Sequence, residues 1–108
     1  MSNNQTTKLS DKIGEPAMLE LMAEECSELA HASLKLARFM RDENPAPDHN
    51  GINLVANLEE EIADVYIILR ELRKTDLLVD DDNISTIMDR KRKRMNERLG
   101  MRAESFIF

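Results

Sequence analysis

The stretch AMLELMAEECSELAHASLKLARFMRDE, residues 17–43, decides the fold because it is long and contains neither glycine nor proline. Apolar side chains recur in it at alternating spacings of three and four residues, which is typical of one face of an α-helix. Pro16 precedes the stretch, where the first turn of a helix tolerates proline, and Pro45 and Pro47 follow it. We therefore predict a helix over about residues 17–43. Its apolar stripe consists of Leu19, Met22, Cys26, Leu29, Ser33, Leu36 and Met40.

Two further segments, residues 52–74 and residues 84–99, have the same helical character. The second of them is followed by Gly100, a typical residue at the end of a helix, and is preceded by Asp80-Asp81-Asp82-Asn83, which supply N-cap candidates. Residues 44–51, with the sequence NPAPDHNG, have the composition of a loop. The sequence therefore predicts three long helices.

The composition favours an all-α domain in which these helices form an antiparallel bundle. The chain has 108 residues, about one domain, and 42% of them are hydrophobic although there is no Trp, one Tyr and three Phe. We assign residues 15–100 to a domain of three to four helices, residues 1–14 to a flexible arm and residues 101–108 to a tail. Three amphipathic helices close a core incompletely, so we expect a homo-oligomer, a dimer or tetramer, to complete the bundle. A compact three-helix monomer is the alternative.

The charge and the cysteine content exclude several classes of protein. Lys and Arg total 15 against 21 Asp and Glu, a net charge of −6, which argues against general binding of DNA or RNA. The single Cys excludes an intramolecular disulfide and a Cys-based zinc site and fits a reducing compartment. No apolar run reaches membrane-spanning length, and no signal sequence opens the chain. We therefore expect a cytoplasmic protein with no membrane or nucleic-acid partner.

Two of the predicted helices carry acids on their apolar faces. In a helical projection Glu25 falls inside the apolar arc of the first helix, and Glu28 lies at its edge, about 60° away. Glu61 and Asp64 repeat this arrangement on the second helix, at the same angular offset. If the two faces meet, the four carboxylates converge.

Four carboxylates in one partly buried site require a compensating cation. Desolvation and mutual repulsion would otherwise raise their pKa values until several became protonated. Carboxylate ligands without Cys or His favour Mg²⁺, or alternatively Mn²⁺, over zinc. Because Mg²⁺ commonly binds a few carboxylates together with substrate phosphates, we predict a metal-bridged phosphate site. The alternative is that these acids are solvated or pair with Lys or Arg.

The third predicted helix carries positive charge on or beside its apolar face. Lys91, Arg94 and Arg98 lie there in the projection and would be suited to binding a triphosphate. The alternative is that these cations are solvated and complement the dipole at the end of the helix.

The acidic residues resemble a known motif. Glu24-Glu25-Cys26-Ser27-Glu28, followed by Glu61-Ile62-Ala63-Asp64, resembles the EExxE…ExxD motif of the all-α nucleoside triphosphate pyrophosphohydrolases. That superfamily includes MazG-like proteins, dimeric dUTPases and phosphoribosyl-ATP pyrophosphatases. The resemblance covers about residues 19–99. It implies Mg²⁺-dependent hydrolysis of an NTP or dNTP to the monophosphate and pyrophosphate by a homo-oligomer.

The resemblance also implies three classes of site residue. The metal ligands would be Glu25, Glu28, Glu61 and Asp64. The catalytic residues would be Glu24, Glu28 and Glu61, with Glu24 or Glu28 accepting a proton from the attacking water. The substrate contacts would be Lys91, Arg94 and Arg98 for the phosphates and Asn96 for the nucleotide.

Two other functions fit the same sequence. One is a non-catalytic helical dimerisation or adaptor module, in which the inward acids pair with Lys91 and Arg98 instead of binding metal. The other is a phosphoribosyl-ATP pyrophosphatase. An assay of pyrophosphate release from a panel of nucleotides separates all three.

Overall fold

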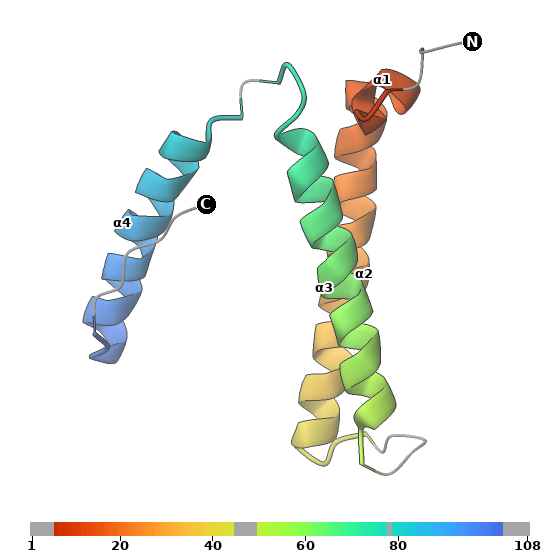
Figure 1. Cartoon of the computed structure of the whole chain (residues 1–108). Helices are drawn as coiled ribbons and strands as arrows, with labels where there is room; N and C mark the ends of the chain where they lie inside the picture. Colours follow the sequence, from red (N-terminus) through yellow and green to blue (C-terminus); the bar gives the residue numbers. More distant parts are fainter. Residues whose placement is uncertain (1–5, 45–49, 78, 103–108) are drawn as a thin grey trace. The chain divides into compact units, whose positions relative to one another are not determined.

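The computed structural model describes residues 6–44, 50–77 and 79–102, and over these residues the chain is all-α, as predicted (Figure 1). The helices are α1 (Leu9–Ile13), α2 (Glu15–Met40), α3 (Ile52–Leu72) and α4 (Asp81–Leu99). They belong to two compact units, Met1–Leu77 with α1, α2 and α3, and Leu78–Phe108 with α4. Across the described residues, every helix is too short or too polar to serve as a membrane span.

In the first unit, α2 and α3 run antiparallel and pack against each other as a helical hairpin (Figure 1). Its core is small and aliphatic: Met18, Ile68 and Leu72 are buried together. Ala32 is buried farther along α2. Partly buried side chains from α1, from α2 and from the segment after α3 complete the packing; they are Leu9, Leu21, Met22 and Leu77.

Both ends of the link between α2 and α3 have a defined backbone geometry. α2 ends at Met40, three residues before the predicted end, because Asp42 adopts a left-handed conformation with φ 59°. The backbone N–H of Glu43 then donates to the carbonyl of Arg38 at 2.8 Å, which closes the helix end. At the start of α3, Gly51 also has a positive φ, 77°, and is buried. Residues 45–49 of the predicted loop lie outside the described residues.

The N-terminal segment differs from the flexible arm that we expected over residues 1–14, because Leu9–Ile13 forms the helix α1. The side chain of Leu9 packs against the hydrophobic core, and its backbone N–H donates to Glu71 Oε1 at 3.0 Å. Lys74 Nζ donates to Glu71 Oε2 at 2.8 Å and to the carbonyl of Thr7 at 3.3 Å. The Lys74 ammonium and the Leu9 N–H lower the pKa of Glu71 below its ordinary value. Residues 1–5 lie outside the described residues.

In the second unit, α4 ends where the sequence predicts and begins earlier than predicted. The Asp80 side chain caps the start by accepting from the backbone N–H groups of Asp82 at 2.8 Å and Asn83 at 3.1 Å. The helix therefore begins at Asp81, three residues earlier than its apolar pattern. Gly100, with φ 66°, ends it. Of the predicted tail over residues 101–108, residues 103–108 lie outside the described part of the chain.

Candidate metal centre

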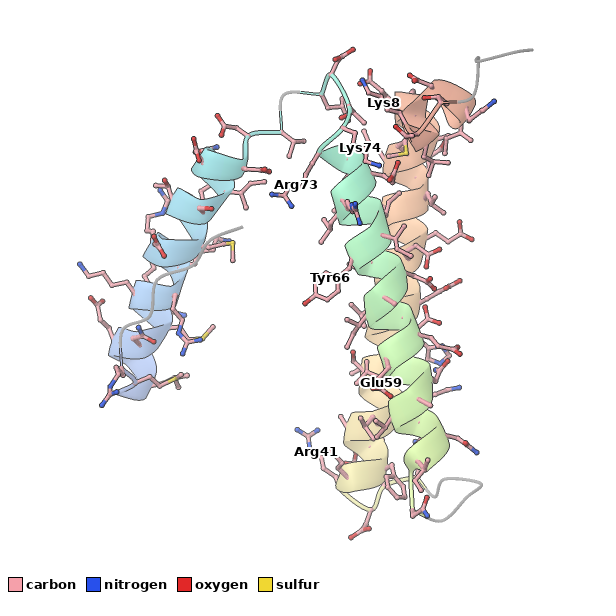
Figure 2. All side chains as sticks on the ribbon, viewed as in Figure 1. Lys8, Arg41, Glu59, Tyr66, Arg73 and Lys74 are labelled. Atoms are coloured by element: carbon pink, nitrogen blue, oxygen red, sulfur yellow. The ribbon has the colours of Figure 1, made fainter. Side chains whose placement is uncertain are left out.

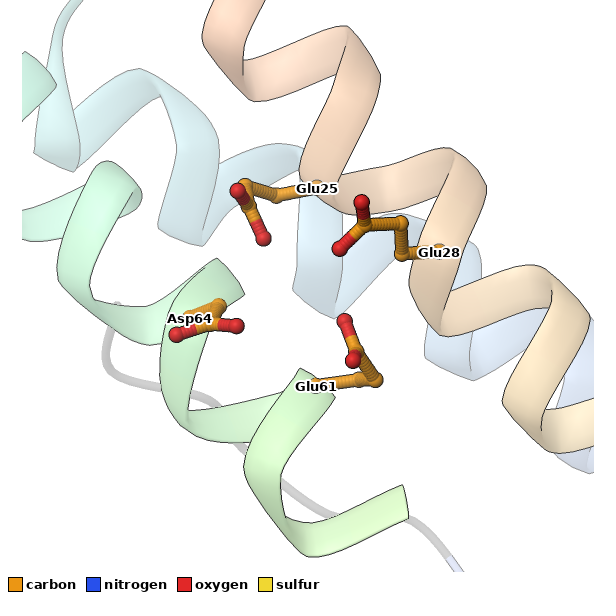
Figure 3. A group of neighbouring side chains, drawn as sticks. All are labelled: Glu25, Glu28, Glu61 and Asp64. Carbon is orange, nitrogen blue, oxygen red and sulfur yellow. The ribbon is translucent and has the colours of Figure 1, made fainter. Parts of the chain in front are cut away.

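The α2–α3 interface brings four acidic side chains together (Figure 3). Glu25 and Glu28 extend from α2, and Glu61 and Asp64 extend from α3. One carboxylate oxygen of each residue lies within 4.8 Å of the corresponding atoms of the other three. We call these four residues the acidic cluster. The angular positions of the acids on the two helices predicted this convergence.

The cluster has an inner and an outer pair. Glu25 and Glu61 are half-buried, whereas Glu28 and Asp64 are exposed. Oε2 of Glu25 and Oε2 of Glu61 are both buried, and neither has a hydrogen-bond partner among the described residues. No Lys, Arg or backbone donor in this part of the chain therefore satisfies these two oxygens, although a buried carboxylate oxygen without a partner is costly.

The close approach of the acids changes their protonation. Burial raises the pKa of Glu25 above its ordinary value, and the neighbouring charges, Glu28 first and then Asp64, raise it further. Burial also raises the pKa of Glu61, and so does Glu28, to which protonated Glu61 can donate a hydrogen bond. Figure 3 shows that, across the interface, the carboxyl group of Glu25 faces Asp64 and that of Glu61 faces Glu28.

The donor atoms fit a hard divalent cation. All four residues offer carboxylate oxygens, the ligands that Mg²⁺ and Mn²⁺ prefer over softer metals. Opposite ligands of an octahedral Mg²⁺ lie about 4.2 Å apart, close to the 4.8 Å within which the four oxygens lie. A cation between the helices would also neutralise the charge of the two unpartnered oxygens. Among the described residues, the structure adds no further acid, His or Cys to this group.

Glu24, the fifth acidic residue of the sequence motif, lies outside the cluster. Its side chain is exposed on α2, and its charge contributes to raising the pKa of Glu25. Glu24 is therefore placed to act on the electrostatics of the cluster without being one of the four converging ligands.

The cations predicted as phosphate contacts are on α4. Lys91, Arg94 and Arg98 line one shallow depression of this helix together with Met95 and Leu99. The three basic side chains therefore share one side of the helix, and two exposed apolar side chains accompany them.

Asn96, predicted as a nucleotide contact, has different surroundings from these cations. It is 6% exposed, and its Oδ1 accepts a hydrogen bond from Arg92 Nε at 2.9 Å. Its Nδ2 is buried and has no partner within residues 79–102, the described part of this unit. The helical periodicity of α4 did not predict this burial, because Asn96 lies beside the apolar face rather than within it.

The resemblance to the pyrophosphohydrolases depends on five acidic anchors, of which the structure brings four together. Glu25 and Glu28 are three residues apart on α2, and Glu61 and Asp64 are three residues apart on α3. This spacing allows both acids of one helix to reach the same site. When the chain is compared with known proteins, no family model, no curated protein and no solved structure matches it.

Proposed function

We propose that this protein is a cytoplasmic, Mg²⁺-dependent hydrolase that converts a nucleoside triphosphate, NTP or dNTP, to the monophosphate and pyrophosphate. One observation carries the proposal: four carboxylates from two helices converge, and two of their oxygens are buried without a partner. An enzyme that acts on a polyphosphate needs a site of this kind, because the substrate brings further negative charge that a cation must bridge.

Glu25, Glu28, Glu61 and Asp64 would hold the metal, with Mn²⁺ able to replace Mg²⁺. When bound, the ion supplies positive charge for the triphosphate oxygens and lowers the pKa of a coordinated water. The inner residues, Glu25 and Glu61, fix the position of the site because packing between α2 and α3 restricts them. The outer residues, Glu28 and Asp64, face solvent, from which the substrate must arrive.

Glu28 is the best placed proton acceptor for the attacking water. It is exposed, and it lies against Glu61 across the helix interface (Figure 3). Glu24, which is exposed and next to Glu25 in the chain, is the second choice for this role or for orienting the water. In either case a carboxylate of the cluster or next to it would take up the proton as the water oxygen attacks phosphorus and the bond to the leaving phosphate group breaks.

Lys91, Arg94 and Arg98 of α4 would bind the substrate's phosphates, whereas the burial of Asn96 argues against the nucleotide contact predicted for it. The three cations lie on the same side of α4, which supports this role, because the several phosphate groups of a triphosphate can contact several cations at once. The exposed Met95 and Leu99 beside them offer an apolar surface for the nucleoside.

We also propose that a homo-oligomer, a dimer or tetramer, completes an antiparallel bundle. The hairpin of α2 and α3 leaves large apolar side chains exposed on both helices, and Figure 2 shows Tyr66 extending away from the hairpin. A hairpin with so few buried side chains gains stability by covering this surface. The exposed apolar residues of the two helices are Leu19, Leu34, Met40, Ile52, Val55, Tyr66 and Ile67.

The test is pyrophosphate release from a panel of NTPs, dNTPs and phosphoribosyl-ATP, in Mg²⁺ and in EDTA. We expect release from at least one NTP or dNTP, and its loss in EDTA. Glu61→Gln should lower kcat by at least about 10²-fold, because one metal ligand loses its charge. Glu60→Gln, a neighbouring exposed acid outside the cluster, is the matched control.

Three results would contradict the proposal. The first is that Glu61→Gln retains the wild-type rate at saturating Mg²⁺. Hydrolysis of phosphoribosyl-ATP alone would identify a different enzyme. No release from any nucleotide would favour the adaptor function.

A further inference from the structure

The acidic cluster lies in the middle of the packing stripe that holds α2 against α3. Glu25 is seven residues after the buried Met18 and seven residues before the buried Ala32, so it takes the position of a core residue on α2. Glu61 has the corresponding place on α3, seven residues before the buried Ile68. The two helices therefore meet through a stripe that is apolar except where the acids face each other.

Little apolar burial offsets this interruption. The buried apolar side chains of the described part of the first unit are Met18, Ala32, Ile68 and Leu72. A stripe that places two half-buried carboxylates between them brings like charges together as the helices close. The buried Oε2 atoms of Glu25 and Glu61 also lose water without gaining a donor.

We infer that a divalent cation in the acidic cluster drives closure of the α2–α3 hairpin, so that the site is a folding element as well as a place for chemistry. The inference depends on the metal-binding part of the proposed function and not on hydrolysis. The cation joins carboxylates of both helices, and without it their charges oppose the contact between the helices.

The inner and outer acids contribute unequally to this coupling. Glu25 and Glu61 have buried oxygens, so their charges weaken the hairpin most when no cation is bound. Glu28 and Asp64 are exposed, and water screens their charges in the open and in the closed hairpin. Neutralising Glu25 and Glu61 should therefore stabilise the hairpin, as the bound cation does. It should also remove the stabilisation that the cation gives to the wild type.

The experiment is thermal unfolding of the full chain, followed by circular dichroism in EDTA and in millimolar MgCl₂. For the wild type we expect Mg²⁺ to raise Tm by about 5 °C or more. For Glu25→Gln/Glu61→Gln we expect a higher Tm than the wild type in EDTA, and a response to Mg²⁺ below about 1 °C. Glu61→Gln alone should show both effects at a reduced size, and it serves as the second variant if the double variant does not fold.

The control is Glu20→Gln/Glu60→Gln. It removes the same net charge from the same two helices, but both residues are exposed and outside the cluster. We expect this variant to keep the wild-type response to Mg²⁺. A loss of that response in the control would overturn the inference, because overall charge would then explain the effect.

Mn²⁺ binding, measured by electron paramagnetic resonance, separates the inference from the proposed function. If the wild type binds Mn²⁺ but neutralising the inner pair does not raise Tm in EDTA, the coupling is wrong and the metal site stands. If the coupling is found but no nucleotide is hydrolysed, the inference stands and the proposed enzyme does not. If the wild type binds no Mn²⁺, both are wrong.

Discussion

Glu25 and Glu61 occupy positions where the periodicity of their helices places apolar residues, and this conflict makes them informative. An acid on the polar face of a helix says little about function, since solvated acids are common there. Two acids on facing apolar stripes, each with a second acid three residues later, indicate a functional site more strongly, because the acids meet when the stripes pack. The structure brings the four carboxylates within 4.8 Å of one another, as this reasoning predicted.

Other residues could not be placed in this way. Asn96 is buried although it lies beside the apolar arc of α4, and the burial of a side chain next to such an arc depends on tertiary contacts. Glu71 resembles any surface acid of a helix, yet it holds the N-terminus of α1 through Leu9. Neither residue has a sequence signal of its own, because its partners are set by packing.

The raised pKa values of Glu25 and Glu61 predict that Mg²⁺ affinity depends on pH. Protons and Mg²⁺ compete for the same oxygens, so affinity should be weakest near pH 5 and increase as pH rises through the raised pKa values. We expect up to about tenfold per pH unit for each proton displaced, and a plateau above these values. Calorimetric titration with Mg²⁺ between about pH 5 and pH 8 measures this dependence, and an unchanged affinity across the range would contradict it.

The stability of the protein in EDTA should change with pH in the opposite direction. Both carboxyls have folded-state pKa values above 4.5, so their contribution to stability is fully present below the unfolded value and is lost as pH rises through the folded values. Tm in EDTA should therefore decrease from mildly acidic to neutral pH in the wild type. The decrease should be smaller in Glu25→Gln/Glu61→Gln, and an equal decrease would contradict the assignment to these groups.

Among the elements, the long helices were predictable and the short one was not. Over many turns the spacing of apolar residues identifies α2 and α3, and Asp80 and Gly100 fix the ends of α4. α1 has five residues, too few for a periodic pattern, and it is stabilised by Leu9 in the core and by Glu71 at its start. A helix of this length depends on tertiary contacts, which a search for local patterns does not detect.

Glu71→Gln should weaken the attachment of α1 to α3, because Gln has one neutral acceptor where Glu71 serves both Leu9 and Lys74. We expect Tm to fall by a few degrees at neutral pH. The pKa of Glu71 is lowered below 4.5, so its contribution is present above that value and is lost as pH falls through the folded-state pKa. Melting curves of the wild type and the variant should therefore converge in acid. A constant difference across the range would show that the charge of Glu71 is not responsible.

Gly51→Ala should destabilise the hairpin through the Phe39 ring. A Cβ at this position would lie 2.5 Å from Cε2 of Phe39, and the φ of 77° disfavours any side chain. We expect a loss of about 2–4 kcal/mol in the free energy of unfolding, measured by denaturant titration. Gly100→Ala is the matched control, since its φ is 66° but no atom of the described residues lies within 4 Å of a Cβ built there. Equal losses in the two variants would exclude the contact with Phe39 as the cause, and Phe39→Leu should partly rescue Gly51→Ala.

In the whole molecule, the acidic cluster and the basic depression of α4 lie in different units. The acidic cluster belongs to the hairpin in the first unit, and the basic depression belongs to α4 in the second unit. The proposed reaction would use both, the carboxylates for the metal and the cations for the phosphates. From the sequence, the convergence of the four acids could be predicted from the projections of two helices, and the shared side of the three cations from the projection of a third.

The position of Mn²⁺ in crystals of the full chain, located by its anomalous scattering, shows whether the acidic cluster binds a divalent cation. We predict a peak between α2 and α3, with carboxylate oxygens of Glu25 and Glu61 and at least one of Glu28 and Asp64 within about 2.0–2.6 Å. A map without a peak there at saturating Mn²⁺, or with those side chains turned into solvent, would show that the acidic cluster is not a metal site.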